Sequence, residues 1–225
     1  ETDHASQDPG RQKTIGEKQQ ARVPSHGMPG ERGSLVESPG EPGSETFGRA
    51  RQQAYHPAVR ALDPGVVRRL VEAIAPAPGD EIVEIGPGQG ALTGPLLERA
   101  KKITAIEIDR GLAAGLREKY RSLGVVIADA LEFVFSSFAP GFRLVGNLPY
   151  NISTPLLFHL ARFARQARDL HFMLQLEVVE RMVARPSTPE YGRLSVMLQT
   201  RFTMQKLFKV AAGCFRPPPK VESAF

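Results

Sequence analysis

The tetrapeptide Asn147-Leu148-Pro149-Tyr150 carries residue types that could bind a flat group bearing an amine. It follows the apolar run 142–146, which is typical of a buried strand. Proline lacks a backbone donor and has a fixed φ, so the carbonyls of Leu148 and Pro149 can point into a cleft beside the Asn147 side chain. These acceptors suit the two N–H bonds of an exocyclic NH2, and the Tyr150 ring suits the face of a planar base. The tetrapeptide therefore predicts a binding site for such a group.

The same residues also fit an ordinary turn between a strand and a helix. Thr154 has a side chain suited to an N-cap, and Pro155 suits the first position of a helix. On this interpretation the helix begins near Thr154 and the tetrapeptide holds no ligand. Both interpretations stay open on these residues alone.

A glycine-rich segment follows the predicted strand at 81–86. It reads GPGQG over residues 86–90, and glycines let a backbone turn tightly and approach a ligand closely. In open α/β sheets ligands bind at the carboxyl ends of the strands, where this segment falls. Glu107 lies in the next predicted strand, close to its end, where a carboxylate can accept hydrogen bonds from both hydroxyls of a ribose. The pattern predicts a cofactor that contains a nucleoside.

Two details favour S-adenosylmethionine (SAM) over a nicotinamide dinucleotide. The glycine spacing is G-x-G-x-G, whereas dinucleotide-binding segments typically read G-x-G-x-x-G. Glu84, two residues before the first glycine, would lie near the amino-acid end of SAM. A nicotinamide oxidoreductase is the alternative, but it would leave the Asn147–Tyr150 tetrapeptide without a role.

A third polar residue, Asp129, follows the third predicted strand. Its carboxylate could accept a hydrogen bond from the N6 amine of the cofactor's adenine, or it could be the N-cap of a helix. Glu107, Asp129 and Asn147 thus lie at the ends of successive predicted strands. Three polar strand ends at one edge of a sheet predict one site rather than three unrelated caps.

From about residue 64 the chain alternates between apolar runs and helical patterns. We expect strands at 81–86, 102–108, 124–128, 142–147 and 170–176, and two further strands at 203–210 and 220–225. We expect helices near 64–75, 91–100, 110–119, 154–165, 177–184 and 191–201. This alternation predicts an α/β fold with a parallel sheet covered on both faces.

The composition narrows the class of protein. No apolar run of about 18 residues occurs, so we expect no membrane span. The single cysteine, Cys214, cannot form an internal disulfide and fits a cytoplasmic location, and the five scattered histidines predict no metal site.

The net charge of the chain is +5, and the excess of basic residues lies after residue 50. This favours an anionic partner such as nucleic acid, although a solvated basic surface has the same composition.

Residues 1–50 differ from the rest of the chain because they are rich in Gly and Pro and poor in large apolar residues. Such a segment cannot bury enough surface to offset its conformational entropy. We therefore expect a disordered tail at 1–50.

Several longer blocks resemble the ribosomal RNA adenine N6-dimethyltransferase family, most closely its bacterial small-subunit branch. The resemblance covers roughly residues 63–225, and the blocks at 146–155 and 215–225 are highly specific. The matching blocks are EIGPGQG (84–90), IEID (106–109), DAL (129–131), GNLPYNISTP (146–155), YGRLSVMLQ (191–199) and FRPPPKVESAF (215–225). The resemblance implies a class I SAM-dependent methyltransferase fold, which is Rossmann-like, with a seven-stranded, mostly parallel sheet that contains one antiparallel strand.

The family's site residues carry over where these blocks match. The resemblance implies that Gly86, Gly88 and Gly90 line the methionine part of SAM, that Glu107 contacts its ribose and that Asp129 contacts its adenine. Glu84, Ala130 and Asn147 are also expected to bind the cofactor. The resemblance also implies that Asn147 and the carbonyls of Leu148 and Pro149 hold the target adenine. Tyr150 would stack on one side of that base and Phe215 would complete the pocket on the other.

The resemblance also implies a substrate. It is a pair of adjacent adenosines in a hairpin loop near the 3′ end of small-subunit rRNA, each methylated twice, in an immature small ribosomal subunit. Lys220 lies near the implied site and could meet an RNA phosphate. We expect a monomer. The alternatives are a large-subunit rRNA adenine methyltransferase of the macrolide-resistance type and a ribosome-assembly factor that binds without catalysis.

The chain departs from the family pattern at two places. Residues 51–63 replace a basic, Phe-Gly-containing motif that contributes to the SAM site in the family, so we treat them as an atypical linker. The sequence also ends at Phe225, before the position of the family's small helical domain. The expected organisation is a tail at 1–50, a linker at 51–63 and a methyltransferase catalytic domain at 64–225, with the helical domain absent.

Overall fold

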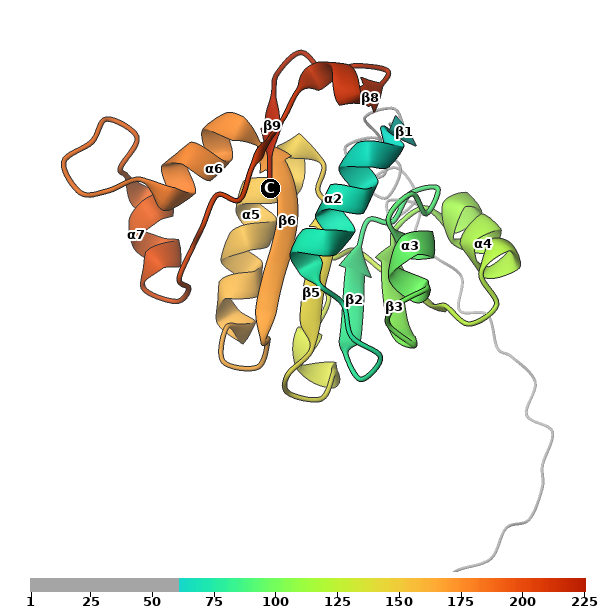
Figure 1. The fold of residues 1–225 in the computed structure, drawn as a ribbon. Helices are drawn as coiled ribbons and strands as arrows, with labels where there is room; N and C mark the ends of the chain where they lie inside the picture. The colour runs from blue at the N-terminus through green and yellow to red at the C-terminus, as the bar shows by residue number, and fades with distance from the viewer. Residues whose placement is uncertain (1–60) are drawn as a thin grey trace, which may run out of the picture. The chain divides into compact units, whose positions relative to one another are not determined.

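The computed structural model describes residues 61–225, so the predictions for 1–60 lie outside the described part. A seven-stranded sheet with the order β4-β3-β2-β5-β6-β9-β7 forms the centre (Figure 1). Its strands are β2 (Glu81–Ile85), β3 (Lys102–Glu107), β4 (Gly124–Ile127), β5 (Arg143–Asn147), β6 (Asp169–Gln175), β7 (Lys209–Val210) and β9 (Ser223–Ala224). Strands β2 to β6 pair in parallel, and β9 pairs antiparallel with both β6 and β7. The predicted mostly parallel sheet with one antiparallel strand is confirmed.

Six α-helices cover the sheet within the described residues. They are α2 (Pro64–Ile74), α3 (Thr93–Leu97), α4 (Arg110–Lys119), α5 (Tyr150–Leu160), α6 (Leu176–Val183) and α7 (Arg193–Gln199). Short 3-10 helices occur at Phe135–Ser137, Ala161–Phe163 and Ala212–Cys214. None of the helices in residues 61–225 is long and apolar enough to cross a membrane.

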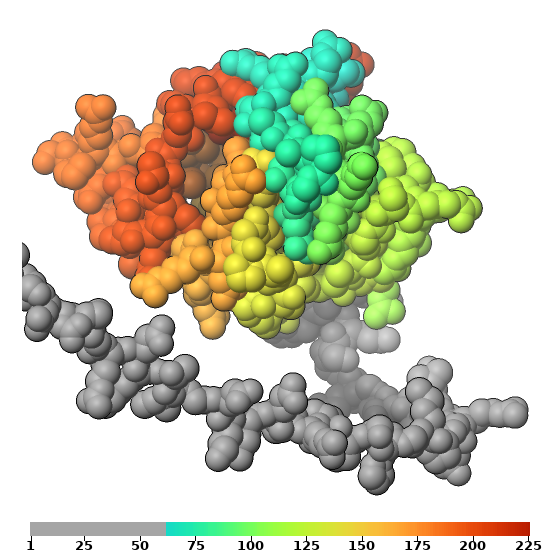
Figure 2. All heavy atoms as spheres, turned by 60° about the horizontal axis from the view of Figure 1, so that its bottom comes forward, coloured from blue at the N-terminus to red at the C-terminus, as the bar shows by residue number. Residues whose placement is uncertain are grey.

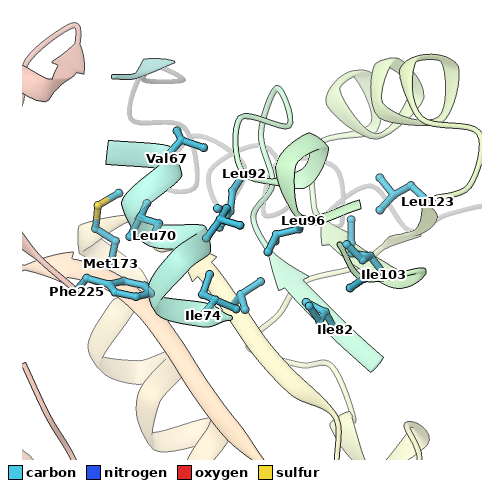
Figure 3. Packing of buried hydrophobic residues seen from close by; sticks show 14 of the residues in the cluster. Val67, Leu70, Ile74, Ile82, Leu92, Leu96, Ile103, Leu123, Met173 and Phe225 are labelled. Atoms are coloured by element: carbon cyan, nitrogen blue, oxygen red, sulfur yellow. The ribbon is translucent and has the colours of Figure 1, made fainter. Parts of the chain in front are cut away.

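The central strands β2, β3 and β5 are largely buried, and their successive side chains point to opposite faces of the sheet. Ile82, Ile103 and Met173 pack with α2 and the residues around α3 in one cluster (Figure 3). Val83 and Phe172 belong to a second cluster with α5. The sheet therefore lies between two helical layers, as the sequence predicts.

Helix α5 begins at Tyr150, so the prediction of a start near Thr154 was wrong. Pro149 is the N-cap, and the Ser153 hydroxyl donates to the Tyr150 carbonyl at 2.9 Å within the first turn. Pro155 lies inside the helix. A proline there lacks the donor of one helical hydrogen bond and is normally unfavourable, which is why the pattern predicted a later start.

The ends of the described chain also differ from the prediction. Part of the expected linker forms β1 (Ala61–Leu62), which pairs antiparallel with β8 (Phe215–Arg216). Asp63, which was assigned to the same linker, is the N-cap of α2 and accepts a hydrogen bond from the Gly65 amide at 2.8 Å. The last two sheet strands are shorter than the ranges 203–210 and 220–225.

A buried arginine joins the first helix to the sheet. The Arg143 guanidinium bonds to Asp80 at 2.7 Å and to Asp169 at 2.8 Å, and it donates to the Ile74 carbonyl at the end of α2 at 2.6 Å. Burial alone would raise the pKa of Asp169, but the hydrogen bonds from His171 and Arg143 outweigh it and lower the pKa to about 2. The network lies at the amino ends of β5 and β6.

We predict that Arg143→Met lowers the free energy of unfolding by about 3–5 kcal/mol, because it removes the buried cation that joins Asp80 to Asp169 and leaves the Ile74 carbonyl without its donor. Arg168→Met is the matched control, since Arg168 bonds to the same Asp80 at 2.9 Å but its side chain is 59% exposed. The control variant should lose less than about 1 kcal/mol. Urea unfolding of both variants checks this, and equal losses would contradict it.

Candidate active site at the carboxyl edge of the sheet

The predicted polar strand ends lie along one edge of the sheet in a defined order. Strand β4 leads to Asp129, β3 ends at Glu107, β2 leads into the glycine segment, and β5 ends at Asn147. These strands are direct neighbours in the order β4-β3-β2-β5. Because neighbouring strands lie about 4.8 Å apart, this row spans roughly 14 Å. The row can therefore accommodate an extended nucleoside with a further group attached.

The glycine segment adopts a backbone that favours glycine. Gly86, Gly88 and Gly90 have φ values of 65°, 59° and 81°. The amide of Gly86 donates to the Ile106 carbonyl at 3.0 Å, which ties the segment to β3. A Cβ on Gly90 would lie 2.7 Å from the Tyr120 ring. The turn thus needs glycine for its conformation and, at Gly90, for space.

Glu107 connects the glycine segment to the loop after β3. One carboxylate oxygen accepts from the Gly88 amide at 3.2 Å, and the other accepts from the Asp109 amide at 3.0 Å. The residue is 6% exposed. Because each carboxylate oxygen has a second lone pair, Glu107 can still accept hydrogen bonds from two hydroxyls of a ligand.

Glu84 lies beneath the glycine segment and is 3% exposed. The pKa of Glu84 is raised to about 7, because burial and the negative charge of Glu107 raise it by more than the hydrogen bond from Thr93 lowers it. That bond runs from the Thr93 hydroxyl to a Glu84 oxygen at 2.6 Å. A bound cation would favour the ionised form of this carboxyl.

Asp129 and Ala130 form the turn that follows β4. The Asp129 side chain accepts from the Leu131 amide at 2.8 Å, so it caps a turn and not an α-helix. Ala130 is buried at 2% exposure in the cluster on the α5 face.

The tetrapeptide 147–150 joins β5 to α5. Asn147 is half-buried and is the last residue of β5, while the Leu148 amide donates to the Met173 carbonyl at 3.1 Å. The Pro149 carbonyl accepts from the Ile152 amide at 3.2 Å. The Tyr150 hydroxyl shares a hydrogen bond of 2.8 Å with Ser223 in β9, which fixes the outer end of the ring. These residues start a helix, although at Tyr150 and not near Thr154, and the binding of a planar group by their acceptors stays a prediction.

Phe215 and Lys220 lie in the segment between β7 and β9, which passes beyond the carboxyl ends of the strands (Figure 1). The Phe215 ring is 3% exposed and packs in the cluster on the α2 face. Lys220 is exposed. Their roles at a base and at a phosphate stay predictions.

Sequence reasoning missed three residues that support this edge: Thr93, Ser223 and Tyr120. Tyr120 donates from its hydroxyl to the Gly90 carbonyl at 3.1 Å, and its ring lies against Gly90 and Gly94. For Thr93 a signal existed, because a hydroxyl three residues after the last glycine can reach a buried acid. Tyr120 and Ser223 lie 30 and 73 residues from their partners, and nothing local marks them.

Comparisons with known proteins identify the family. The family described as "Ribosomal RNA adenine dimethylase" matches residues 61–225. Proteins named "Ribosomal RNA small subunit methyltransferase A" are similar to the chain. The one from Bordetella pertussis is 60% identical over 164 residues, which cover 72% of this chain and 62% of the relative. The one from Aromatoleum aromaticum is 57% identical with the same coverage. The chain thus spans less than two thirds of the length of these relatives.

Two solved structures are also similar. A dimethyladenosine transferase from Plasmodium falciparum is 33% identical with a TM-score of 0.62, and the match covers 73% of this chain and 61% of that one. The 23S rRNA methyltransferase ErmE gives the same identity and TM-score, covering 73% and 67%. Both matches confirm the predicted methyltransferase fold. The chain belongs to the ribosomal RNA adenine dimethylase family.

Proposed function

We propose that this chain carries the catalytic domain of a SAM-dependent enzyme that dimethylates N6 of adenosines in small-subunit rRNA. The order of acceptors along the sheet edge carries the proposal. From β4 to β5, the groups at this edge are Asp129, Glu107, the glycine segment and Asn147. The parts of SAM follow in the same order, from adenine through ribose to sulfonium and methionine, and the target base comes after them.

The acceptors on this edge fit the donors of SAM. Asp129 can accept from the adenine amine and Glu107 from the ribose hydroxyls, while the glycine segment lets the ligand approach its backbone. At Gly86 the direction of a Cβ meets no atom within 4 Å, which leaves room there. The buried carboxyl of Glu84 offers a negative charge to a ligand that is cationic at its ammonium and sulfonium.

When bound, SAM supplies a methyl group on a good leaving group. The chain's own residues then have to orient a poor nucleophile, because the lone pair of adenine N6 is delocalised into the ring. Asn147 and the carbonyls of Leu148 and Pro149 accept the two N–H bonds, which favours a pyramidal nitrogen with its lone pair toward the methyl. Orientation of this kind supplies most of the rate, so no strong general base is required.

The target base has to leave its stack to reach this edge. Unstacking costs a few kcal/mol and is least costly in a loop. Tyr150 then offers its face to the base, and its hydrogen bond to Ser223 fixes the ring before the base arrives. The similarity to the small-subunit enzymes at 57–60% identity favours small-subunit rRNA over the large-subunit rRNA that the name of the 33% identical structure gives.

The test is a methylation assay on small ribosomal subunits whose rRNA lacks the modification, with SAM as the methyl donor. Mass spectrometry of the nucleosides detects the product. We expect N6,N6-dimethyladenosine in the hairpin loop near the 3′ end. Asn147→Ala should slow the transfer by about 10²–10³-fold, by analogy with the loss of one oxyanion-hole donor. Asn151→Ala, on the exposed first turn of α5, is the matched control and should keep the rate.

Other outcomes of this assay would contradict the proposal. Methylation confined to large-subunit rRNA would assign the chain to the other branch. Subunits that bind the chain without gaining any methyl group would indicate an assembly factor. An unchanged rate in Asn147→Ala would remove that side chain from the reaction.

The buried Glu84 predicts a pH dependence of stability. Because the folded state raises the pKa of this carboxyl from 4.5 to about 7, the folded state holds its proton more tightly than the unfolded state does. Stability therefore falls as pH rises from about 4.5 to about 7, by roughly 3 kcal/mol in total.

Glu84→Gln removes this titration and keeps an acceptor for Thr93. We expect the variant to gain stability relative to the parent as pH rises from 5 to 8, while its affinity for SAM falls. Thermal unfolding at several pH values and calorimetry with SAM measure the two effects. A difference in melting temperature that does not change with pH would contradict the assignment.

A further inference from the structure

The side of the molecule opposite to the proposed site is formed by the segments that lead into β3, β4, β5 and β6. These segments are 98–102, 120–124, 138–143 and 161–169, and we call their surface the amino-end face. Figure 2 brings it forward, with the green segments before β3 and β4 beside the yellow and light-orange segments before β5 and β6. Among these segments only Glu98 adds an exposed negative charge. Their exposed basic residues include Lys101, Lys102, Arg121, Arg162, Arg165 and Arg168.

Three arginines extend from one short segment of this face. Arg162, Arg165 and Arg168 are the exposed residues of 161–169, and they recur at every third position. The segment begins as a 3-10 helix at Ala161–Phe163, and residues three apart lie on the same side of such a turn. Two backbone hydrogen bonds of 2.7 and 2.8 Å join the segment to the loop before β5. The arginines therefore extend from a backbone whose position is fixed.

The other cations continue this group across the sheet. Arg168 bonds to the buried Asp80, which directly precedes β2, at 2.9 Å. Lys102, the first residue of β3, bonds to Glu81 at 2.7 Å. Arg121 lies in the turn before β4. Because β6 and β4 are four strand spacings apart, the cations form a row of roughly 19 Å.

Most of these cations are available to an anion from outside the chain. Within residues 61–225 no carboxylate forms an ion pair with Lys101, Arg121, Arg162 or Arg165. A row of exposed Lys and Arg side chains on a fixed backbone suits the phosphates of a nucleic acid.

The edge that would hold SAM has the opposite charge. Glu107, Asp109, Asp129 and Glu132 follow β3 and β4 there, and Arg110 is the basic residue among them. This edge suits a cationic cofactor but repels phosphates. The RNA backbone therefore has to be held by cations outside this row of strand ends.

The residue types of the amino-end face indicate which form of RNA it fits. In its described segments no aromatic side chain is exposed, since Phe138 and Phe163 are half-buried and Phe142 is buried. Unpaired bases are usually held by stacking on exposed aromatic rings. Lys and Arg without such rings contact the sugar–phosphate backbone regardless of sequence. A duplex, which presents its backbone and hides its bases, matches this chemistry.

We propose that the amino-end face binds the phosphates of a second, double-stranded segment of rRNA while the opposite edge holds the loop with the target adenosine. This inference rests on the proposed function, because it takes rRNA as the substrate. The five residues of β2 alone separate the two faces by roughly 17 Å, so the nucleotides in the site cannot also reach the arginines. The enzyme thus contacts two parts of the ribosomal subunit at once.

The test compares two double variants of the full chain that lose the same charge. Arg162→Gln with Arg165→Gln removes two cations of the row. Arg117→Gln with Arg181→Gln is the matched control, because both guanidinium groups already have a partner in the chain. Arg117 donates to the Val125 carbonyl at 2.8 Å, and Arg181 bonds to Glu177 at 2.8 Å. Binding to small subunits that lack the modification is measured at several salt concentrations.

We expect Arg162→Gln with Arg165→Gln to weaken binding to the subunits about 10-fold. The slope of log K against log salt concentration should become shallower by about 2, because two phosphate contacts are lost. The control pair, and Arg162→Lys with Arg165→Lys, should bind as the parent does. All variants should match the parent in melting temperature, in affinity for SAM and in affinity for an isolated hairpin that carries the target loop.

Equal losses in the two glutamine pairs would overturn the proposal, because total charge would then explain the binding. An equal loss on the isolated hairpin would also overturn it, because it would place the arginines at the target loop. A parent chain that neither binds nor methylates subunits would contradict the proposed function and this inference with it. If the parent does both and Arg162→Gln with Arg165→Gln binds equally well, only this inference fails.

Discussion

The proposed site depends on the hydrogen bonds that the Glu107 carboxylate accepts. Its two oxygens accept backbone hydrogen bonds from Gly88, after β2, and from Asp109, after β3. One side chain thus sets the position of the glycine segment relative to the next loop. A ligand that bonds to Glu107 also meets a loop whose conformation is already fixed, which lowers the entropy lost on binding.

Other contacts hold the same segment from the opposite side. Tyr120 at the end of α4 donates to the Gly90 carbonyl, and Thr93 bonds to the buried Glu84 below the segment. These contacts explain how three residues with positive φ keep one conformation. The cost is a carboxyl in an apolar interior, which raises the pKa of Glu84. The protein is therefore less stable at neutral pH than at acidic pH, but it holds a negative charge beneath a cationic ligand.

Much of this arrangement could be predicted from the sequence because it follows from local rules. The alternating apolar runs predict the parallel sheet, and a parallel sheet brings Glu107, Asp129 and Asn147 to one edge without any knowledge of long-range contacts. The start of α5 could not be predicted in the same way, since Pro155 suits the first position of a helix better than the interior position that it occupies. Pairings of two residues, such as β1 with β8, leave no periodic pattern. The contacts of Tyr120 and Ser223 depend on packing between distant segments.

The most direct measurement is a crystal structure of this chain with S-adenosylhomocysteine. We predict that the adenine lies at Asp129, that the ribose hydroxyls bond to Glu107, and that the sulfur lies above the glycine segment and faces Asn147. A ligand bound in the reverse direction, or away from this edge, would contradict the order of groups on which the proposed function depends.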